Sequence, residues 1–247
     1  ECFRERQITV RGVPARPLHA ANEFGGHQMR RKKIIVAAVT AVALLAAGGL
    51  FASNMGFKLN YGMLAGTNAG SLNGTATLGL PFNPQTGIID AQTLLTDIGS
   101  TNITSITQYV EATGSLVSYT NTGGGTNFPL NVGEGYYARM AADTNYIVVG
   151  SHDPSLQISL DAGDGGVTSL NGTNFVAYPY HSTANDAQAL LTEIGSTNVT
   201  SITQYVASTG SLVSYTNVGG GTNFPLTPGE AYFIRSAADY LWTPAHY

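Results

Sequence analysis

Two stretches of this chain, residues 90–130 and residues 186–226, repeat each other almost residue for residue. They align without a gap over 41 positions and differ at six, residues 93, 97, 103, 111, 112 and 122 of the first stretch. Similarity extends upstream, where residues 71–82 match residues 169–180, and downstream, where residues 133–143 match residues 229–239. A repeat of this length is one structural unit made twice. We therefore predict two tandem modules, related over the longest match by an offset of 96 residues.

Each copy carries the signal of one short helix. In the first copy, apolar residues follow the three- and four-residue spacing of an amphipathic helix: Ala91, Leu94, Leu95 and Ile98. Asp90 is placed to cap the start of this helix, and Gly99 is placed to end it. The second copy repeats the pattern between residues 186 and 195.

The remainder of each copy is typical of β-structure. Apolar and polar residues alternate at 57–61 and at 156–160, which predicts half-buried opening strands. In both copies, SITQYV and SLVSYT flank a short turn with a glycine, which predicts a hairpin whose glycine takes a positive φ. We predict an α+β, mainly β fold: two tandem β-sandwich or barrel-like modules, each with one short amphipathic helix.

The N-terminal part has a different character. A basic cluster at residues 29–33 precedes an unbroken apolar run that ends in small residues, which is the order of a secretory signal peptide. The run is also long enough for an N-terminal membrane anchor, so that alternative stays open. We expect four segments: a non-native upstream extension at 1–28, the signal peptide or anchor at 29–52, a first β-rich module at 53–153, and its internal duplicate at 154–247. Either way, the modules are expected to be secreted or held at the cell surface.

The charge of residues 53–247 argues against two classes of partner. Three basic residues, Lys58, Arg139 and Arg235, stand against twelve acidic residues, a formal net charge of −9. Nucleic acids and anionic membrane surfaces are bound by clustered Lys and Arg, so neither is expected here, and the membrane would be reached only through an uncleaved N-terminal segment. This segment also has no cysteine, so its stability has to come from packing.

Several short motifs carry a resemblance to a known group of proteins. SNMGFK lies at 53–58, GLPFNP at 79–84, GEGYY at 133–137 and VGSHDP at 149–154. In these motifs the chain resembles poorly characterised secreted bacterial proteins made of tandem β-repeats. The resemblance implies export and a tandem β-architecture. It implies no reaction and no catalytic residues.

The familiar catalytic motifs are not in this sequence: it has no GxSxG elbow, no HExxH and no phosphate-binding P-loop. Carboxylates that recur in both copies are the remaining candidates, since a glycosidase uses a pair of them. Glu134 recurs as Glu230, and Asp97 recurs as Glu193. We predict no catalytic residue and no cofactor.

The recurring acids have a structural explanation that we favour. Glu134 and Arg139 recur together as Glu230 and Arg235, and Asp143 and Asp239 follow them at equal spacing. We predict one bracing ion pair per module, Glu134 with Arg139 and Glu230 with Arg235. Asp161 and Asp164, in the turn DAGDGG, are weak candidates for calcium, because the turn lacks the alternating oxygen ligands of an EF-hand loop.

Three functions remain open. The first hypothesis is a non-catalytic structural protein of the cell surface, such as a subunit of an extracellular fibre or matrix, which would associate with itself or with other surface components; in one version the strand at 57–61 pairs with another subunit. The alternative is an adhesin or glycan-binding module whose tyrosines face the ligand: Tyr109, Tyr119, Tyr136, Tyr205, Tyr215 and Tyr232. A glycosidase-like enzyme is the least favoured.

Overall fold

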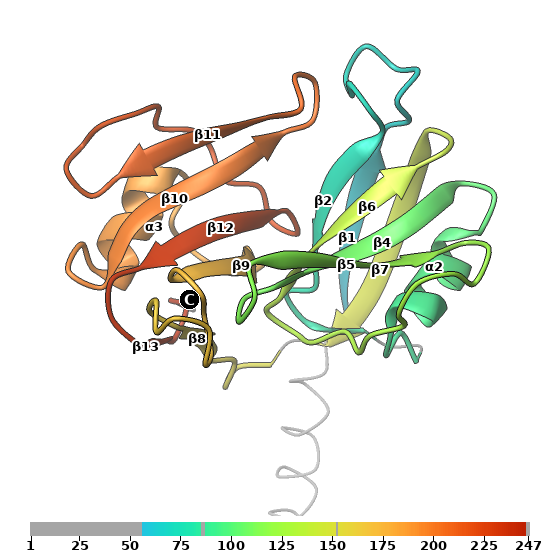
Figure 1. Ribbon diagram of the computed structural model, residues 1–247. Helices are drawn as coiled ribbons and strands as arrows, with labels where there is room; N and C mark the ends of the chain where they lie inside the picture. The colour runs from blue at the N-terminus through green and yellow to red at the C-terminus, as the bar shows by residue number, and fades with distance from the viewer. Residues whose placement is uncertain (1–55, 85–86, 152, 246–247) are drawn as a thin grey trace, which may run out of the picture. The chain divides into compact units, whose positions relative to one another are not determined.

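The computed structural model describes residues 56–84, 87–151 and 153–245. The expected extension and signal segment therefore lie outside the described residues. In chain order the elements are β1 (Gly56–Met63), β2 (Thr75–Gly79), β3 (Asn83–Pro84), α2 (Ala91–Ile98), β4 (Ile103–Val110), β5 (Ser115–Thr120), β6 (Gly135–Met140), β7 (Thr144–Ser151), β8 (Ile158–Leu160), β9 (Thr173–Ala177), α3 (Ala187–Ile194), β10 (Val199–Val206), β11 (Ser211–Thr216), β12 (Ala231–Ser236) and β13 (Tyr240–Trp242). The prediction of a mainly β fold with short helices is confirmed (Figure 1).

The strands form antiparallel sheets in the same order in both halves of the sequence. We call residues 56–151 the first repeat and residues 153–245 the second repeat. The first repeat contains a four-stranded sheet, β2-β6-β4-β5, and a three-stranded sheet, β1-β7-β3. The second repeat contains the equivalent four-stranded sheet, β9-β12-β10-β11, and a two-stranded sheet, β13-β8. Equivalent sequences thus take equivalent places in their sheets.

Each repeat has its own cluster of buried apolar side chains. In β1, Leu59, Tyr61 and Met63 are buried while their neighbours in sequence are exposed, as expected of a strand with one face on a core. The first cluster joins these side chains to those of β4, β6, β7 and α2. The second cluster does the same in the second repeat and contains the buried Trp242. Removing these side chains from water is the main favourable contribution to folding.

Both helices follow the capping signals of the sequence. The Asp90 side chain accepts a hydrogen bond from Thr93 N at 2.7 Å, and Thr93 Oγ1 accepts one from Asp90 N at 3.0 Å, so two free amides at the helix start are satisfied. In α3 the residue equivalent to Thr93 is Ala189, and Asp186 alone caps the helix. The predicted ends at Gly99 and Gly195 are also confirmed.

The triple glycine of each copy folds back onto the edge of a sheet. Tyr119 of β5 forms a bridge with Gly125, and Thr126 N donates to Ser118 O at 3.1 Å. Gly125 has a φ of +86°, and a Cβ on it would lie 2.1 Å from Ser118 O, so only glycine fits there. The equivalent bridge joins Tyr215 to Gly221. The loop therefore covers part of an edge that could otherwise pair with another chain.

The first strand pairs with the last strand of its own repeat. β1 and β7 run antiparallel over eight residue pairs, from Gly56 with Ser151 to Met63 with Thr144. β1 is at the edge of its sheet, because the strand order is β1-β7-β3. One edge of the strand at 57–61 is therefore used within the chain.

Reciprocal backbone hydrogen bonds join the two repeats. Leu72 N donates to Ala207 O at 2.8 Å, and the equivalent residue Leu170 donates to Glu111 O, also at 2.8 Å. Gly79 N donates to Gly229 O at 2.7 Å, and the equivalent Ala177 donates to Gly133 O at 2.9 Å. Each repeat thus gives the other the same contacts that it receives.

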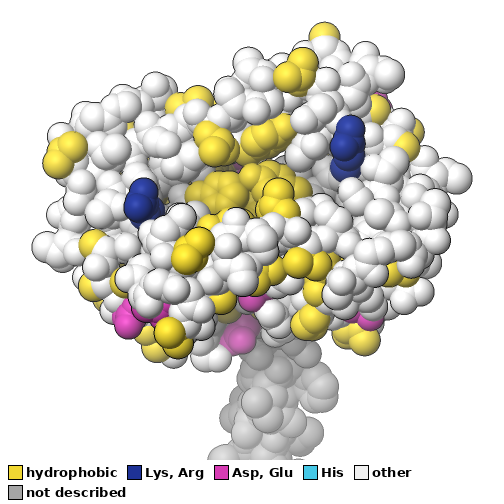
Figure 2. Space-filling view, viewed as in Figure 1, with side chains coloured by type: hydrophobic (Ala, Val, Ile, Leu, Met, Phe, Trp, Pro, Cys, Tyr) yellow, Lys and Arg dark blue, Asp and Glu magenta, His cyan; other side chains and the backbone are white. Residues whose placement is uncertain are grey.

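Aromatic rings fill the region between these hydrogen bonds. Tyr137 and Tyr205 meet edge to face with ring centroids 5.6 Å apart, and the equivalent pair, Phe233 and Tyr109, meets in the same way at 5.5 Å. Phe175 stacks on Phe233 at 4.3 Å. Figure 2 shows hydrophobic side chains gathered in the middle of one face of the molecule. Packed aromatic rings contribute strongly to such contacts.

Candidate functional site

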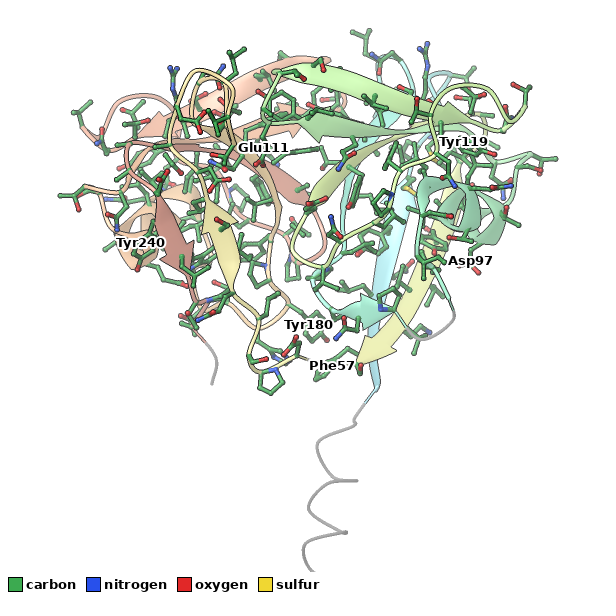
Figure 3. The ribbon with its side chains drawn as sticks, turned by 60° about the horizontal axis from the view of Figure 1, so that its bottom comes forward. Phe57, Asp97, Glu111, Tyr119, Tyr180 and Tyr240 are labelled. Carbon is green, nitrogen blue, oxygen red and sulfur yellow. The ribbon has the colours of Figure 1, made fainter. Side chains whose placement is uncertain are left out.

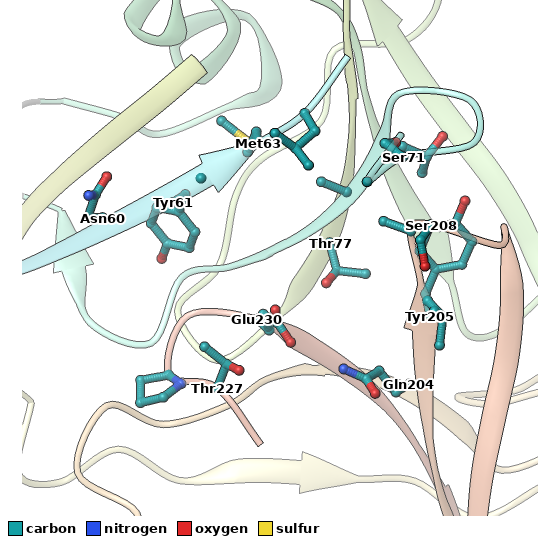
Figure 4. Close-up of a pocket in the computed structure, with 18 residues that line it drawn as sticks. Asn60, Tyr61, Met63, Ser71, Thr77, Gln204, Tyr205, Ser208, Thr227 and Glu230 are labelled. Carbon is teal, nitrogen blue, oxygen red and sulfur yellow. The ribbon is translucent and has the colours of Figure 1, made fainter. Parts of the chain in front are cut away.

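The reciprocal contacts leave a cleft on either side, each lined by both repeats. The first cleft, with a volume of about 350 Å³, is lined by residues 60–64, 70–71, 75–77, 204–208, 227–228 and 230 (Figure 4). The second cleft, of about 180 Å³, is lined by residues 108–112, 134–135, 168 and 175. Residues 204–208 and 230 of the first cleft are the copies of residues 108–112 and 134 of the second. The two clefts are therefore equivalent positions in the repeated structure.

Two substitutions place larger side chains in the wall of the second cleft. Its wall contains Phe175, where the first cleft has Thr77, and Glu111, where the first cleft has Ala207. Phe175 is buried, and Glu111 Oε1 accepts a hydrogen bond from Phe175 N at 3.2 Å. Figure 3 shows Glu111 where the two repeats meet. Only the first cleft reaches the volume of ordinary ligand pockets, roughly 300–1,000 Å³.

The polar groups of the two clefts are satisfied differently. In the second cleft, Gln108 Nε2 donates to Glu134 Oε2 at 3.4 Å, and Asn131 Nδ2 donates to Glu134 Oε1 at 2.9 Å. The first cleft has Thr227 in place of Asn131. Within the described part of the chain, neither the Gln204 amide nor Glu230 Oε1 has a hydrogen-bond partner in the protein. These groups are free to bind a ligand.

A tyrosine holds the carboxylate of each cleft in place. Tyr232 OH donates to Glu230 Oε2 at 2.8 Å and accepts a hydrogen bond from Thr227 N at 2.8 Å. Burial, followed by the nearby Glu230 charge, raises the pKa of Tyr232 well above its ordinary range, so it remains a donor at physiological pH. One oxygen of Glu230 is thus fixed by the protein, and the other is left for the cleft.

A backbone donor of β2 also points into the first cleft. Amides two residues apart on a strand point to the same side. Thr75 N and Gly79 N both donate away from β6, to Asn73 Oδ1 and Gly229 O. Thr77 N, between them, therefore faces the cleft, as its counterpart Phe175 N faces Glu111.

In the second cleft, the carboxylate of Glu111 lies near that of Glu134, and its pKa shows that a second negative charge is unfavourable there. Burial raises the pKa of Glu111 to about 7, although the hydrogen bond from Phe175 N lowers it. Repulsion from Glu134 and Asp161 raises it further. A negative charge at this position is therefore disfavoured.

The six predicted ligand-facing tyrosines fall into three kinds. Tyr205 lines the first cleft, and Tyr109 lines the second. Tyr119 and Tyr215 pack against the apolar cluster of their own repeat. For Tyr136 and Tyr232 the prediction was wrong, because both are core residues with 0% and 1% of their surface exposed.

The predicted ion pairs do not form among the described residues. Along an extended strand Glu134 and Arg139 are five positions apart, which places them on opposite faces and roughly 17 Å from each other. Glu134 binds Tyr136 instead, and Arg139 is exposed on β6. Glu230 and Arg235 repeat this arrangement. The acids that follow cap loops: Asp143 accepts Ala65 N at 2.8 Å, and Asp239 accepts Ala162 N at 2.9 Å.

The two calcium candidates have structural roles. Asp164 accepts hydrogen bonds from the backbone amides of residues 166, 167, 168 and 169. The hydrogen bonds from Thr168, Gly166 and Val167 lower its pKa to about 2. Asp161 accepts the Ser159 hydroxyl at 3.0 Å. Among the residues described, no three His, Cys, Asp or Glu side chains lie together as a metal site. Asp164 organises its turn through these hydrogen bonds.

The recurring carboxylates do not converge. Glu230 lines the first cleft, and Glu134 lines the second. On the helices, Asp97 accepts Tyr146 OH at 2.7 Å, and Glu193 accepts Trp242 Nε1 at 3.2 Å. Each acid thus has its own structural partner, and none of these pairs shares a cleft.

The cleft residues other than the tyrosines and Glu230 were missed by sequence reasoning. The sequence predicts a strand at Gln204 and assigns no role to Thr77. A signal did exist for the closing residues. Glu111 against Ala207 is one of the six differences in the longest match, and Thr77 against Phe175 is a large change of side-chain size at equivalent positions of β2 and β9. Differences between otherwise equal copies mark the places where their roles diverge.

In the described ranges, no helix has both the length and the apolar character needed to cross a membrane. Comparisons with protein-family models, with curated proteins and with solved structures found nothing that matches this chain.

Proposed function

We propose that this chain is an exported, non-catalytic protein of the cell surface that binds a ligand in the first cleft. In this proposal it consists of two tandem β-sandwich modules. A four-stranded sheet and a smaller sheet enclose the apolar cluster of each repeat, and this arrangement supports the sandwich description. Export is supported by the signal-like segment at 29–52.

The observation that carries the proposal is the difference between the two clefts. If the clefts only joined the modules, both could be packed in the same way. Instead Phe175 and Glu111 fill the second cleft, and Asn131 and Gln108 satisfy its carboxylate. The equivalent groups of the first cleft face an open space. Convergent polar groups in a preformed cavity are typical of a binding site.

Binding is better supported than reaction. Glu230 is the one carboxylate among the residues that line the first cleft, as far as the described chain goes, and Tyr232 already holds one of its oxygens. A glycosidase requires two carboxyl groups across the scissile bond, about 5–9.5 Å apart. The fibre hypothesis has less support for another reason: the glycine loops cover part of the edges of β5 and β11, and β7 occupies one of the two edges of β1.

The test is a binding screen that assumes no ligand class. The purified chain is screened by calorimetry against neutral oligosaccharides, acidic oligosaccharides, short peptides and nucleotides. A double variant, Thr77→Phe with Ala207→Glu, introduces the two closing residues of the second cleft. We expect one class to bind the unaltered protein and to lose at least tenfold in affinity with this variant.

The matched control is Gln108→Ala in the second cleft, which should leave binding unchanged. Gln204→Ala repeats the test with a smaller change, in case the double variant fails to fold by circular dichroism. If no class binds, or if the double variant and Gln204→Ala both bind as well as the unaltered protein, the first cleft is not the binding site and the proposal is overturned.

A further inference from the structure

Within the described chain, the first cleft is lined by many hydrogen-bonding groups and by no Lys or Arg. Glu230 Oε1 accepts hydrogen bonds, and the amides of Gln204 and Asn60 both donate and accept. The hydroxyls of Thr77 and Ser208 add further groups of both kinds. The basic residues Lys58, Arg139 and Arg235 do not line the cleft. A phosphate, sulfate or carboxylate would therefore find no countercharge.

The second cleft indicates where a ligand oxygen belongs in the first. There, a carboxylate oxygen of Glu111 takes the hydrogen bond of Phe175 N. In the first cleft Ala207 has no such oxygen, and the equivalent donor, Thr77 N, faces the cavity. An oxygen atom of the ligand would complete this bond in the place where Glu111 completes it in the copy.

That ligand oxygen should be uncharged. Glu230 stands beside the first cleft as Glu134 stands beside the second, and Glu134 is among the groups that disfavour a negative charge on Glu111. A hydroxyl or ether oxygen accepts the amide hydrogen bond without that repulsion.

One aromatic ring forms part of the wall. Tyr205 lines the first cleft, is half-buried, and is held by the edge of Tyr137 and by a hydrogen bond of 3.3 Å from its hydroxyl to Asn73. Such a ring gives a ligand a fixed apolar surface with a polar tip. It suits the C–H groups of a sugar ring, whose hydroxyls can reach Gln204 and Glu230.

We infer that the first cleft binds a neutral carbohydrate, with sugar hydroxyls paired to Glu230 Oε1, Gln204 and Asn60, one sugar oxygen on Thr77 N, and a sugar face on Tyr205. This inference rests on the proposed function and specifies its ligand. An extended peptide is the competing ligand, because β1 is an edge strand. The lining favours carbohydrate, since its side chains are mainly amides, hydroxyls and one carboxylate.

The experiment compares neutral sugars with their acidic equivalents. An array of neutral, uronic-acid and sulfated oligosaccharides identifies the best neutral binder, whose affinity is then measured by calorimetry next to its uronic-acid form. We expect the acidic form to bind at least tenfold more weakly. Glu230→Gln should narrow this gap severalfold, because it removes the charge and keeps the shape and the contact with Tyr232.

Matched variants locate the contacts. Gln204→Ala and Tyr205→Ala should each weaken binding of the neutral sugar at least fivefold, while Gln108→Ala and Tyr109→Ala in the second cleft should leave it within twofold. Circular dichroism shows whether each variant is folded. Tighter binding of the acidic form, or a gap that Glu230→Gln leaves unchanged, overturns the carbohydrate assignment.

The outcomes separate this inference from the proposed function. If peptides bind instead of sugars, and the Thr77→Phe, Ala207→Glu variant abolishes that binding, the carbohydrate inference is wrong and the cleft remains a binding site. If neither sugars nor peptides nor nucleotides bind, both are wrong.

Discussion

The two clefts between the repeats share the equivalent positions 204–208 and 108–112 and the equivalent Glu230 and Glu134, but only the first is open. The second is closed by its own side chains, since Phe175 occupies space and Glu111 takes the free amide of β9. The first keeps the same Glu and Gln positions, but within the described chain Glu230 Oε1 and the Gln204 amide have no hydrogen-bond partner. The structural work of joining the repeats is done by the reciprocal hydrogen bonds and rings, which both sides share. The residues that differ between the clefts are therefore not needed to join the repeats, and those of the first cleft can bind a ligand.

The largest expected effect comes from reopening the second cleft. Phe175→Thr introduces the residue of the first cleft and removes a ring that is 3% exposed and stacked on Phe233. By analogy with buried Phe→Ala changes, we expect the free energy of unfolding to fall by about 3 kcal/mol. Urea unfolding monitored by circular dichroism measures it. A loss below about 1 kcal/mol would mean that Phe175 is not the packed wall of the second cleft.

Glu111, which is present only in the second cleft, should make the stability of the protein depend on pH. The pKa of Glu111 is about 7 in the folded protein and 4.5 ordinarily, so the folded protein holds this proton more tightly. Its contribution is fully present below about pH 4.5 and is lost as the pH rises through about 7. The free energy of unfolding should fall by up to about 3 kcal/mol across this range.

The control for this prediction is Glu111→Gln, which keeps the shape and cannot titrate. Urea unfolding at several pH values should show that the free energy of unfolding of the unaltered protein falls as the pH rises from about 4.5 to 7. The Glu111→Gln variant should show only the smaller change that comes from other titratable groups. The carboxyl groups whose pKa is lowered, such as Asp164, lose their stabilising contribution at more acid pH and do not interfere. Parallel curves for the two proteins would contradict the burial of Glu111.

The two repeats approach each other closely at Gly79 and Ala177, and exchanging these two residues tests that contact. A Cβ on Gly79 would lie 2.5 Å from Ala177 Cβ, so Gly79→Ala should cost about 1–3 kcal/mol by overpacking. The double variant Gly79→Ala with Ala177→Gly removes the closest contact and should recover part of the loss; the rest should remain because the added Cβ still lies 2.8 Å from the Cα of residue 177. Urea unfolding of both variants measures it, and an equal loss in both would show that the two residues do not share one space.

The smallest effect is expected at the single difference within the repeated glycine loop. Thr122 is exposed, and its counterpart Val218 is 87% exposed. Thr122→Val removes a hydrogen bond of 3.0 Å to the exposed Thr120 hydroxyl, which water can replace. The free energy of unfolding should change by less than about 0.5 kcal/mol. A larger loss in urea unfolding would show that the loop depends on this side chain.

Patterns over a few neighbouring residues were sufficient to predict the helices and strands. They were not sufficient to predict the clefts. The helix at 91–98 could be predicted because its cap, its apolar spacing and its terminal glycine lie within ten residues of one another. The pairing of β1 with β7 joins residues at opposite ends of a repeat, and nothing in the two strands specifies the partner. The clefts depend on which faces of the two repeats meet. The alternation of apolar and polar residues within a strand does not determine this.

One error was avoidable from the sequence alone. Glu134 and Arg139 recur together, but recurrence alone does not mean that two residues touch. Their separation of five positions on a strand already places them on opposite faces. Glu134 instead accepts hydrogen bonds from Tyr136, Asn131 and Gln108.

The reciprocal hydrogen bonds have a consequence for the origin of this protein. Contacts in which each half gives what it receives are those of a two-fold symmetric dimer. Two separate copies of one repeat could make the same contacts, and symmetry would then oblige both clefts to be alike. Joining the copies in one chain removes that obligation. A change such as Thr to Phe can then close one cleft without closing the other. A symmetric pair of sites thereby becomes a single open site, and the closed copy in the same chain shows what the site looks like when it is filled.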